Sequence, residues 1–411
     1  MRTRFVPGLP RRRGQVGVSL IEVVVGMAIG VIASLVIMRS FSGSETFRRN
    51  VSGAADTVQT ASLIGARLGM LFEEAGASLV QGRNIWGCKL LATRGKTALL
   101  PAASYPDPFS GFAKNVRVLP VGVLDGGDNS DIALVISGSS ASSNRDVPFD
   151  SDGKTLNVAN PNGVGIANTG LAVDDLLLAV PQDVAAGPGD CQIVQVASDF
   201  SGGKAVADAS YGLKVMPAES AVTAPASYTN IKLNIGAASY GALVSTADSP
   251  SAFHLGREAG PTLSLISVNE GGELVEYDLL QRTGMMPFGE NVVLFKVRYG
   301  VDNGVGGAAN DNVVDEWISP GEAGWTLADL MDGRTATEQK IDQIKAVRIG
   351  VVVRSPQLVI NDAKLTEIVL FSDLSDARKV TRKLESAEQR YGYQVYDWVI
   401  PLRNMKSTPK S

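Results

Sequence analysis

The sequence offers few residues that could carry out catalysis. His254 is the only histidine among 411 residues, which excludes a metal site built from several histidines and the H-E-x-x-H motif. The sequence also has no G-x-S-x-G nucleophile elbow, no P-loop and no G-x-G-x-x-G dinucleotide motif after a strand. Asp and Glu number 42, but no spacing singles out a catalytic pair. We expect a protein that is not an enzyme, with His254 as a surface or hydrogen-bonded polar residue.

Two acidic, glycine-rich segments supply oxygen atoms of the kind that calcium accepts. They run from Asp125 to Asp131 and from Asp302 to Asp315, and neither has the spacing of an EF-hand loop. Asp and Asn are equally common in turns, where their side chains bond to nearby backbone groups. We expect solvated turns and no cofactor, and we keep a calcium site as the less favoured alternative.

A single apolar segment near the N-terminus contains a carboxylate. Val23 to Met38 is free of charge, and the apolar residues from Val18 to Ile21 extend it to membrane-spanning length with only Glu22 in between. A charge inside a bilayer costs about 2.5 to 3.5 kcal/mol on insertion scales. Glu22 should therefore have a partner or a function.

The charges around this segment predict its orientation. Five arginines and no acid precede it: Arg2, Arg4, Arg11, Arg12 and Arg13. By the positive-inside rule the N-terminus lies in the cytoplasm and the rest of the chain is exported. The net charge of −4 argues against a general nucleic-acid surface.

The N-terminus fits an ordinary secretory signal poorly, because an acid lies within the apolar run and no A-x-A-like site follows it. A basic leader ending in Gly17, followed by Val18-Ser19-Leu20-Ile21-Glu22, instead resembles the class III signal of type IV pilins and type II secretion pseudopilins. The resemblance implies that prepilin peptidase cleaves between Gly17 and Val18 and methylates Val18, although the family usually has Phe at that position. It also implies that Glu22 attracts the new terminal amine of a neighbouring subunit.

Apolar residues at three- and four-residue steps continue beyond the membrane segment, so we expect one helix from about Val18 to about Leu79. Gly26 and Gly30 form a weak G-x-x-x-G signal for close helix packing. The expected divisions are a removed leader (1–17), a membrane or filament-core helix (18–41), its amphipathic continuation (42–80) and a β-rich periplasmic region (81–411) that divides into two lobes near 218–229.

Short apolar runs separated by turn residues predict antiparallel strands beyond residue 81. The expected fold class is therefore α+β, with a long N-terminal helix packed on a large β-rich, pilin-like region. The expected strands are Ile132–Ser137, Asp175–Val180, Gln192–Ala197, Leu263–Val268, Leu274–Leu279, Val292–Tyr299, Ala346–Val353 and Val395–Leu402.

Five further segments occur in the order found in PilW-type minor pilins, which the chain resembles from Val18 to Met405. They are Trp86–Leu90, Asp174–Ser198, Val292–Gly304, Ala346–Pro356 and Val399–Met405. The resemblance implies a minor pilin held in the inner membrane, with a periplasmic C-terminal region, that primes pilus assembly and caps the fibre. The implied partners are prepilin peptidase, other minor pilins, the major pilin and the inner-membrane assembly platform. A type II secretion pseudopilin, and a tip adhesin or DNA-uptake module delivered by the pilus, remain as alternatives.

Two cysteines, Cys88 and Cys191, fall in the exported part of the chain. An even number of cysteines in an oxidising compartment favours a disulfide between them, with free buried thiols as the alternative. The bond would tie the end of the long helix to the first lobe.

Overall fold

The computed structural model contains two compact units, Met1–Gly53 and Ala54–Ser411. The structure describes residues 19–79, 85–94, 97–139, 147–148, 155–157, 175–181, 188–195, 212–214, 231–233, 238–240, 251–257, 260–280, 283–358 and 365–405. The expected lobe division near 218–229 lies outside these residues.

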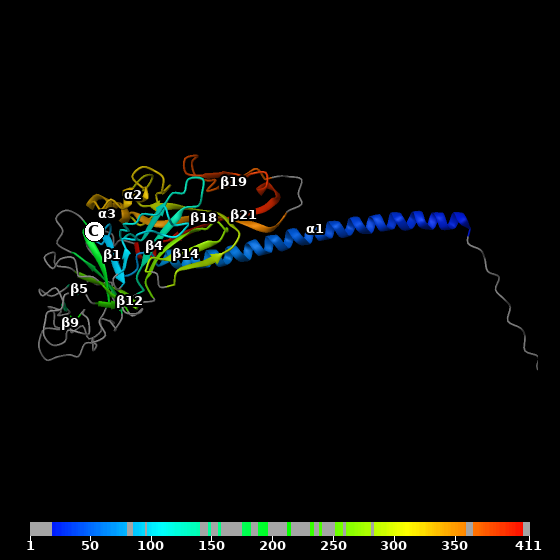
Figure 1. The fold of residues 1–411 in the computed structure, drawn as a ribbon. Coiled ribbons are helices and arrows are strands. Elements are labelled where there is room, and N and C mark those ends of the chain that lie inside the picture. The colour runs from blue at the N-terminus through cyan, green and yellow to red at the C-terminus, as the bar shows by residue number, and fades with distance from the viewer. Residues whose placement is uncertain are drawn as a thin grey trace, which may run out of the picture. The chain divides into compact units, whose positions relative to one another are not determined.

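One helix, α1 (Leu20–Glu73), accounts for the N-terminal part of the described chain and continues into the second unit (Figure 1). Its first part, Leu20–Phe41, is long and apolar enough to cross a membrane, with a mean hydropathy of 2.6. The helix ends six residues before the predicted Leu79. Gly76 adopts a positive φ of 75°, a conformation that commonly terminates helices, and the chain then turns toward Leu79.

Most of the second unit is built from three antiparallel-rich sheets. The five-stranded sheet has the order β15 (Met285–Gly289), β14 (Leu274–Asp278), β13 (Thr262–Val268), β4 (Ile132–Ser137) and β3 (Val121–Leu124). The four-stranded sheet has the order β17 (Glu316–Ile318), β16 (Val292–Val301), β18 (Ile344–Leu358) and β21 (Tyr391–Pro401). The six-stranded sheet has the order β2 (Thr97–Leu100), β1 (Lys89–Arg94), β8 (Asp190–Gln195), β7 (Asp175–Val180), β12 (Ser251–Arg257) and β5 (Val147–Pro148). Within this last sheet β1 and β8 are parallel.

Shorter elements complete the described chain. The paired strands are β6 (Thr155–Asn157) with β9 (Gly212–Lys214), β10 (Ile231–Leu233) with β11 (Ala238–Tyr240), and β19 (Glu367–Leu370) with β20 (Val380–Lys383). The short helices are α2 (Leu327–Leu330), α3 (Thr335–Asp342), η3 (Glu388–Arg390) and η4 (Arg403–Met405). The α+β fold class predicted from the sequence is confirmed.

The eight predicted strands all exist, and their boundaries show what sequence patterns miss. β4 and β7 have the predicted limits, whereas β18 runs for 15 residues and extends well beyond the predicted Ala346–Val353. β8 begins two residues before the predicted Gln192, because its first residues pair with β1. Long cross-strand pairing therefore extends strands beyond their apolar centres.

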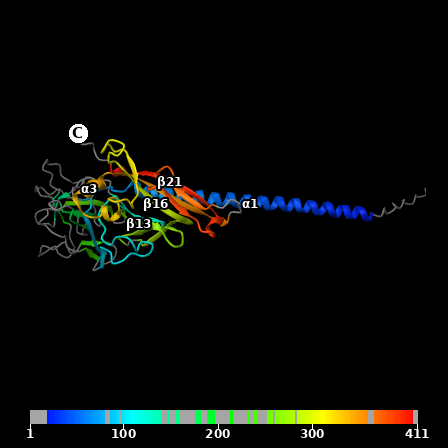
Figure 2. The same ribbon diagram turned by 90° about the horizontal axis from the view of Figure 1, so that it is seen from above.

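The buried stripe of α1 belongs to the same hydrophobic core as the three large sheets. Ile64, Leu68 and Phe72 are fully buried in it, at the three- and four-residue steps of a helix face. Figures 1 and 2 show this part of α1 running beside β14 and β21. The continuation of the long helix is thus part of the core of the β-rich unit.

A second, smaller core lies on the other face of the four-stranded sheet. It contains Leu294 and Val352 of the sheet together with four residues from the segment that includes the β19–β20 hairpin, namely Ile368, Leu370, Phe371 and Leu384. Arg348 holds this segment with a bidentate pair of bonds to Asp373, of 2.7 and 2.8 Å. The hydrogen bonds to Asp373 and Asp397 raise the pKa of Arg348 above its usual value.

Candidate functional site on helix α1

The first part of α1 carries the residue that the sequence singled out, Glu22, in its first turn. Every side chain from Leu20 to Phe41 is exposed, and large apolar residues such as Leu20 and Met38 remain more than two-thirds exposed. Gly17 and Val18 lie outside the described residues. An apolar surface of this extent marks a membrane or protein interaction site. The N-terminal helix therefore indicates a membrane anchor.

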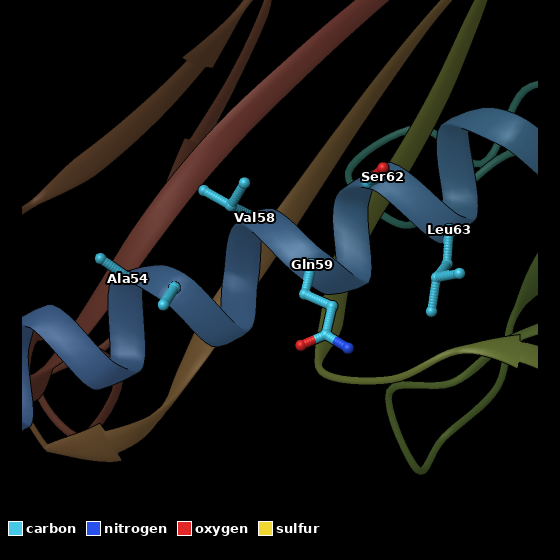
Figure 3. Close-up of a pocket in the computed structure, with 6 residues that line it drawn as sticks. Ala54, Val58, Gln59, Ser62 and Leu63 are labelled. Carbon is cyan, nitrogen blue, oxygen red and sulfur yellow. The ribbon is translucent and has the colours of Figure 1, made fainter.

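The second part of α1 is apolar on two faces. Val58, Leu63 and Met70 are more than half exposed, although the opposite stripe is buried in the core. A shallow hollow, open to solvent and lined mainly by apolar atoms, lies on α1 between Ala54 and Leu63. Figure 3 shows Val58 and Leu63 projecting away from the helix axis on successive turns of α1. We call the residues that line this hollow, with the polar Gln59 and Ser62 among them, the outer groove.

The buried face of α1 is fixed by close packing against β-strands. A Cβ atom built on Gly289 of β15 would lie 2.6 Å from Ile64, and one built on Gly65 would lie 3.0 Å from the ring of Trp398 in β21. Glycine at these two positions therefore allows the helix and the strands to approach closely. Arg67 adds an ion pair of 2.7 Å with Glu276 of β14.

The C-terminal end of α1 is held by the last described residues of the chain. The Asn404 side chain donates to the carbonyl oxygens of Glu73, Glu74 and Ala75 at 3.2 to 3.4 Å. The last carbonyl groups of a helix have no partner within the helix, so Asn404 supplies what the helix itself cannot. Arg403 pairs with Glu73 at 3.0 Å. The outer groove is thus presented by a helix whose other face and end are anchored.

Cys88 and Cys191 form a disulfide in the structure, with their Cα atoms 5.7 Å apart. Both cysteines are fully buried, and the parallel pairing of β1 with β8 places Leu90 opposite Cys191. The bond joins the segment that follows α1 to a strand 103 residues later.

The first acidic segment is organised around a buried lysine. Lys296 of β16 is 1% exposed and donates to Asp131 at 2.7 Å, to the carbonyl of Gly127 at 2.7 Å and to Asp125 at 3.3 Å. Asp131 also accepts from the backbone N–H groups of Gly126 and Val297. Burial alone would raise the pKa of Asp125, but the charge of Lys296 and the hydrogen bonds that Asp125 makes, including one from the Gly127 N–H, together hold that pKa below its usual value. These carboxylates thus already have a cationic partner.

The second acidic segment is a loop closed by its own aspartates. Asp302 is fully buried and accepts from the N–H groups of Asn310 and Asn312 at 2.5 and 2.7 Å. Asp315 accepts from the N–H of Gly304 at 2.6 Å. Both segments therefore use their carboxylates as turn-forming acceptors. Within the described part of the chain, no three His, Cys, Asp or Glu residues are grouped so as to hold a metal ion.

His254 lies in β12 and is buried, with 7% of its surface exposed. Its Nε2 lies 3.0 Å from Oδ2 of Asp175, which is also buried, on the neighbouring strand β7. The histidine is therefore a hydrogen-bonded polar residue inside the six-stranded sheet, one of the two roles predicted for it.

Sequence reasoning missed the importance of Lys296 and Arg298. A signal was available, because both interrupt an otherwise apolar strand at alternate positions and so share one face of β16. Arg298 is 4% exposed, its Nε donates to the carbonyl of Arg378, and its guanidinium lies 5.1 Å from the ring of Phe371. These two residues fix the loops on the outer face of the four-stranded sheet.

Comparisons with known proteins give one positive result. No curated protein and no solved structure matches the chain significantly. Residues 266–404 match the family model described as PilW, Type IV Pilus-assembly protein W. The matched region runs from β13 to η4 and includes the β21 strand that packs on α1 together with Asn404, which caps it. This region of the chain is PilW-like, and the match supports an involvement in type IV pilus assembly.

Proposed function

We propose that this chain is a minor pilin. It is synthesised with a leader that prepilin peptidase removes between Gly17 and Val18, and Val18 is then methylated. The mature chain is held in the inner membrane by the first part of α1, with its C-terminal region in the periplasm, and is later incorporated into the pilus. The observation that carries the proposal is the uncovered apolar helix Leu20–Phe41, with a single acid in its first turn, on a chain that matches a pilus-assembly family.

Glu22 gives this arrangement a physical reason. After cleavage it would lie four residues from a new terminal amine, among helices that exclude water. Opposite charges attract far more strongly in such low-dielectric surroundings than in water. A buried charge without a partner is costly, so Glu22 favours the position in which it meets the amine of a neighbouring subunit. The pair thus sets the register of the incoming subunit.

The outer groove continues the interaction surface beyond the membrane. Its apolar side chains, Val58 and Leu63, lie on a helix whose opposite face is already packed. Packing of a neighbouring subunit along this face would remove them from water, with a gain of about 25 cal/mol per Å² of apolar surface. We propose other minor pilins as these neighbours. The resulting complex primes assembly on the inner-membrane platform, receives the major pilin and remains at the fibre tip.

The match to the pilus-assembly family supports a pilus over a type II secretion system.

The first test follows Glu22→Ala through processing and incorporation. We expect the variant to have the same mature N-terminal mass as the wild type in membranes, and to be lost from sheared surface fibres. Glu74→Ala is the matched control, because Glu74 is an exposed acid just beyond the end of the same helix. Normal incorporation of Glu22→Ala would refute the role of Glu22, and an intact leader on the wild-type chain would refute the minor-pilin proposal itself.

The second test introduces a charge into the outer groove with Val58→Lys. Val58 is 54% exposed, so the folded unit should tolerate lysine, whereas a neighbouring apolar helix should not. We expect normal abundance in membranes and reduced abundance in fibres, with Glu74→Lys as the control. Equal incorporation of both variants would show that the outer groove is not a subunit contact.

A further inference from the structure

We propose that the β-rich unit binds an acidic sugar in a polar pocket on the side of the four-stranded sheet where β16 begins. The pocket has a volume of about 560 Å³ and is lined by parts of the chain that are far apart in sequence, including Asp128, Asn129, Glu270, Asn291, Arg354 and Arg382. We call it the polar pocket. This proposal goes beyond the role in pilus assembly and does not depend on it.

Arg354 of β18 is the cation that the polar pocket leaves without a counterion. It forms no ion pair with a carboxylate of the described residues, and its Nε is buried without an acceptor. The Cζ atom of its guanidinium lies over the Tyr391 ring, 4.6 Å from the ring centre. A fixed, planar guanidinium is the group best suited to bind a carboxylate through two parallel hydrogen bonds.

The second arginine of the polar pocket is already neutralised. Arg382 donates to Glu388 at 2.7 Å and to the carbonyl of Val293 at 3.0 Å. One positive charge is therefore available to a ligand, and it belongs to Arg354.

The pocket also offers carboxylates, which accept hydrogen bonds, and amides, which both accept and donate them. Asp107, Asp128 and Glu270 are exposed carboxylates on its lining. The amide side chains of Asn129 and Asn291 lie on the same lining and form no hydrogen bond within the described residues. A ligand must therefore bring hydrogen-bond donors for the carboxylates as well as an anion for Arg354.

The backbone holds these groups in place before any ligand arrives. Asn291 has a positive φ of 58° and its carbonyl accepts from the backbone N–H of Arg354 at 2.8 Å. Gly272, which also lines the pocket, has a positive φ of 75° and its carbonyl accepts from the backbone N–H of Val292 at 2.8 Å. A preformed site of this kind needs little ordering when it binds.

A sugar that carries a carboxylate meets both requirements. Its carboxylate would pair with Arg354, and its hydroxyl groups would donate to the carboxylates and amides around it. A neutral sugar would leave Arg354 unpaired. A polyanion such as a nucleic acid would bring more negative charge than Arg354 alone can neutralise, next to the carboxylates of Asp128 and Glu270.

The experiment is a titration of the full-length protein in detergent micelles, by calorimetry and saturation-transfer NMR. The probes are glucuronate, galacturonate and N-acetylneuraminate, with glucose and acetate as comparators that lack the carboxylate or the hydroxyl groups. We expect saturable binding of at least one acidic sugar in the millimolar range or tighter, and at least tenfold weaker binding of glucose and acetate.

Three variants locate the site. Arg354→Gln should weaken binding of the acidic sugar at least tenfold, and Asp128→Asn, at an exposed position, should weaken it severalfold without affecting folding. Arg334→Gln is the control, since Arg334 is 81% exposed and lies outside the pocket lining. No saturable binding of any of the three acidic sugars would overturn the proposal. Equal affinity for acetate, or unchanged binding in Asp128→Asn and Arg354→Gln, would also overturn it.

Discussion

The contact between Ile64 and Gly289 tests whether the second part of α1 is packed on the β-rich unit as described. Ile64 is fully buried, and a Cβ atom added to Gly289 would lie 2.6 Å from both its Cδ1 and Cγ1 atoms. Gly289→Ala should therefore overpack the contact and lower the free energy of unfolding by about 1 to 3 kcal/mol. Ile64→Ala should lower it by about 2 to 5 kcal/mol by leaving a cavity.

The double variant is the decisive measurement. Removing the Ile64 side chain frees the space that the methyl group introduced by Gly289→Ala needs, so the two effects should not add. We expect the double variant to be more stable than the sum of the single effects predicts by about 1 to 2 kcal/mol, within the range known for residues in contact.

The assay is chemical denaturation of the full-length protein in detergent, followed by tryptophan fluorescence. Trp398 is a useful reporter because its ring lies against Gly65, next to the mutated position. Gly69→Ala is the matched control. A Cβ atom at Gly69 would meet nothing within 4 Å, so alanine should stabilise the helix by up to about 1 kcal/mol. A neutral Gly289→Ala, or single effects that add to within about 0.5 kcal/mol, would refute the packing.

Three further predictions concern the second unit. Reducing the Cys88–Cys191 bond should lower the free energy of unfolding by up to about 4 to 5 kcal/mol, which is the chain-entropy estimate for a loop of this length. Two thiols that can be alkylated in unreduced periplasmic protein would contradict the bond. Lys296→Met should lower the free energy of unfolding by about 3 to 5 kcal/mol in the same denaturation assay, because it leaves the buried charge of Asp131 unpaired. A loss below about 1 kcal/mol would contradict the role of this ion pair. Burial would raise the pKa of Glu316, but hydrogen bonds from Asn303 and Arg378 and the charge of Arg378 hold it below the usual value. The contribution of Glu316 to the stability of the fold should therefore be complete above about pH 4.5 and be lost as the pH falls through the lowered pKa. Glu316→Gln should flatten that part of the stability profile, and an unchanged profile would count against the assignment.

Local sequence patterns were sufficient to predict α1 and eight of the described strands, although β1 and β12 were not among them. A helix face repeats every three to four residues and a strand of this kind is a short apolar run, so neither requires knowledge of the rest of the chain. The end of α1 was less predictable. The helix stops at Glu73, and its last carbonyl groups are bonded by Asn404, more than 300 residues away in the sequence.

The polar pocket and the lysine network could not have been predicted in the same way. Arg354, Asn291 and Asp128 come from three separate segments and are neighbours only after the sheets have formed. Lys296 and Asp131 are 165 residues apart, and nothing in the spacing of either one indicates the other. Their pairing depends on where β16 lies relative to the β3–β4 turn.

The sequence by itself determined the apolar N-terminal helix, the position of Glu22 within it, the number of cysteines and the β-rich character of the remaining chain. These depend on composition and on local periodicity. Only the tertiary structure decided which face of α1 is buried and which carries the outer groove, because both faces are apolar and the difference arises from packing against β15 and β21. Only the fold decided which charges are paired, because pairing depends on distance in space rather than on spacing along the chain. It left Arg354 without a carboxylate partner among the described residues.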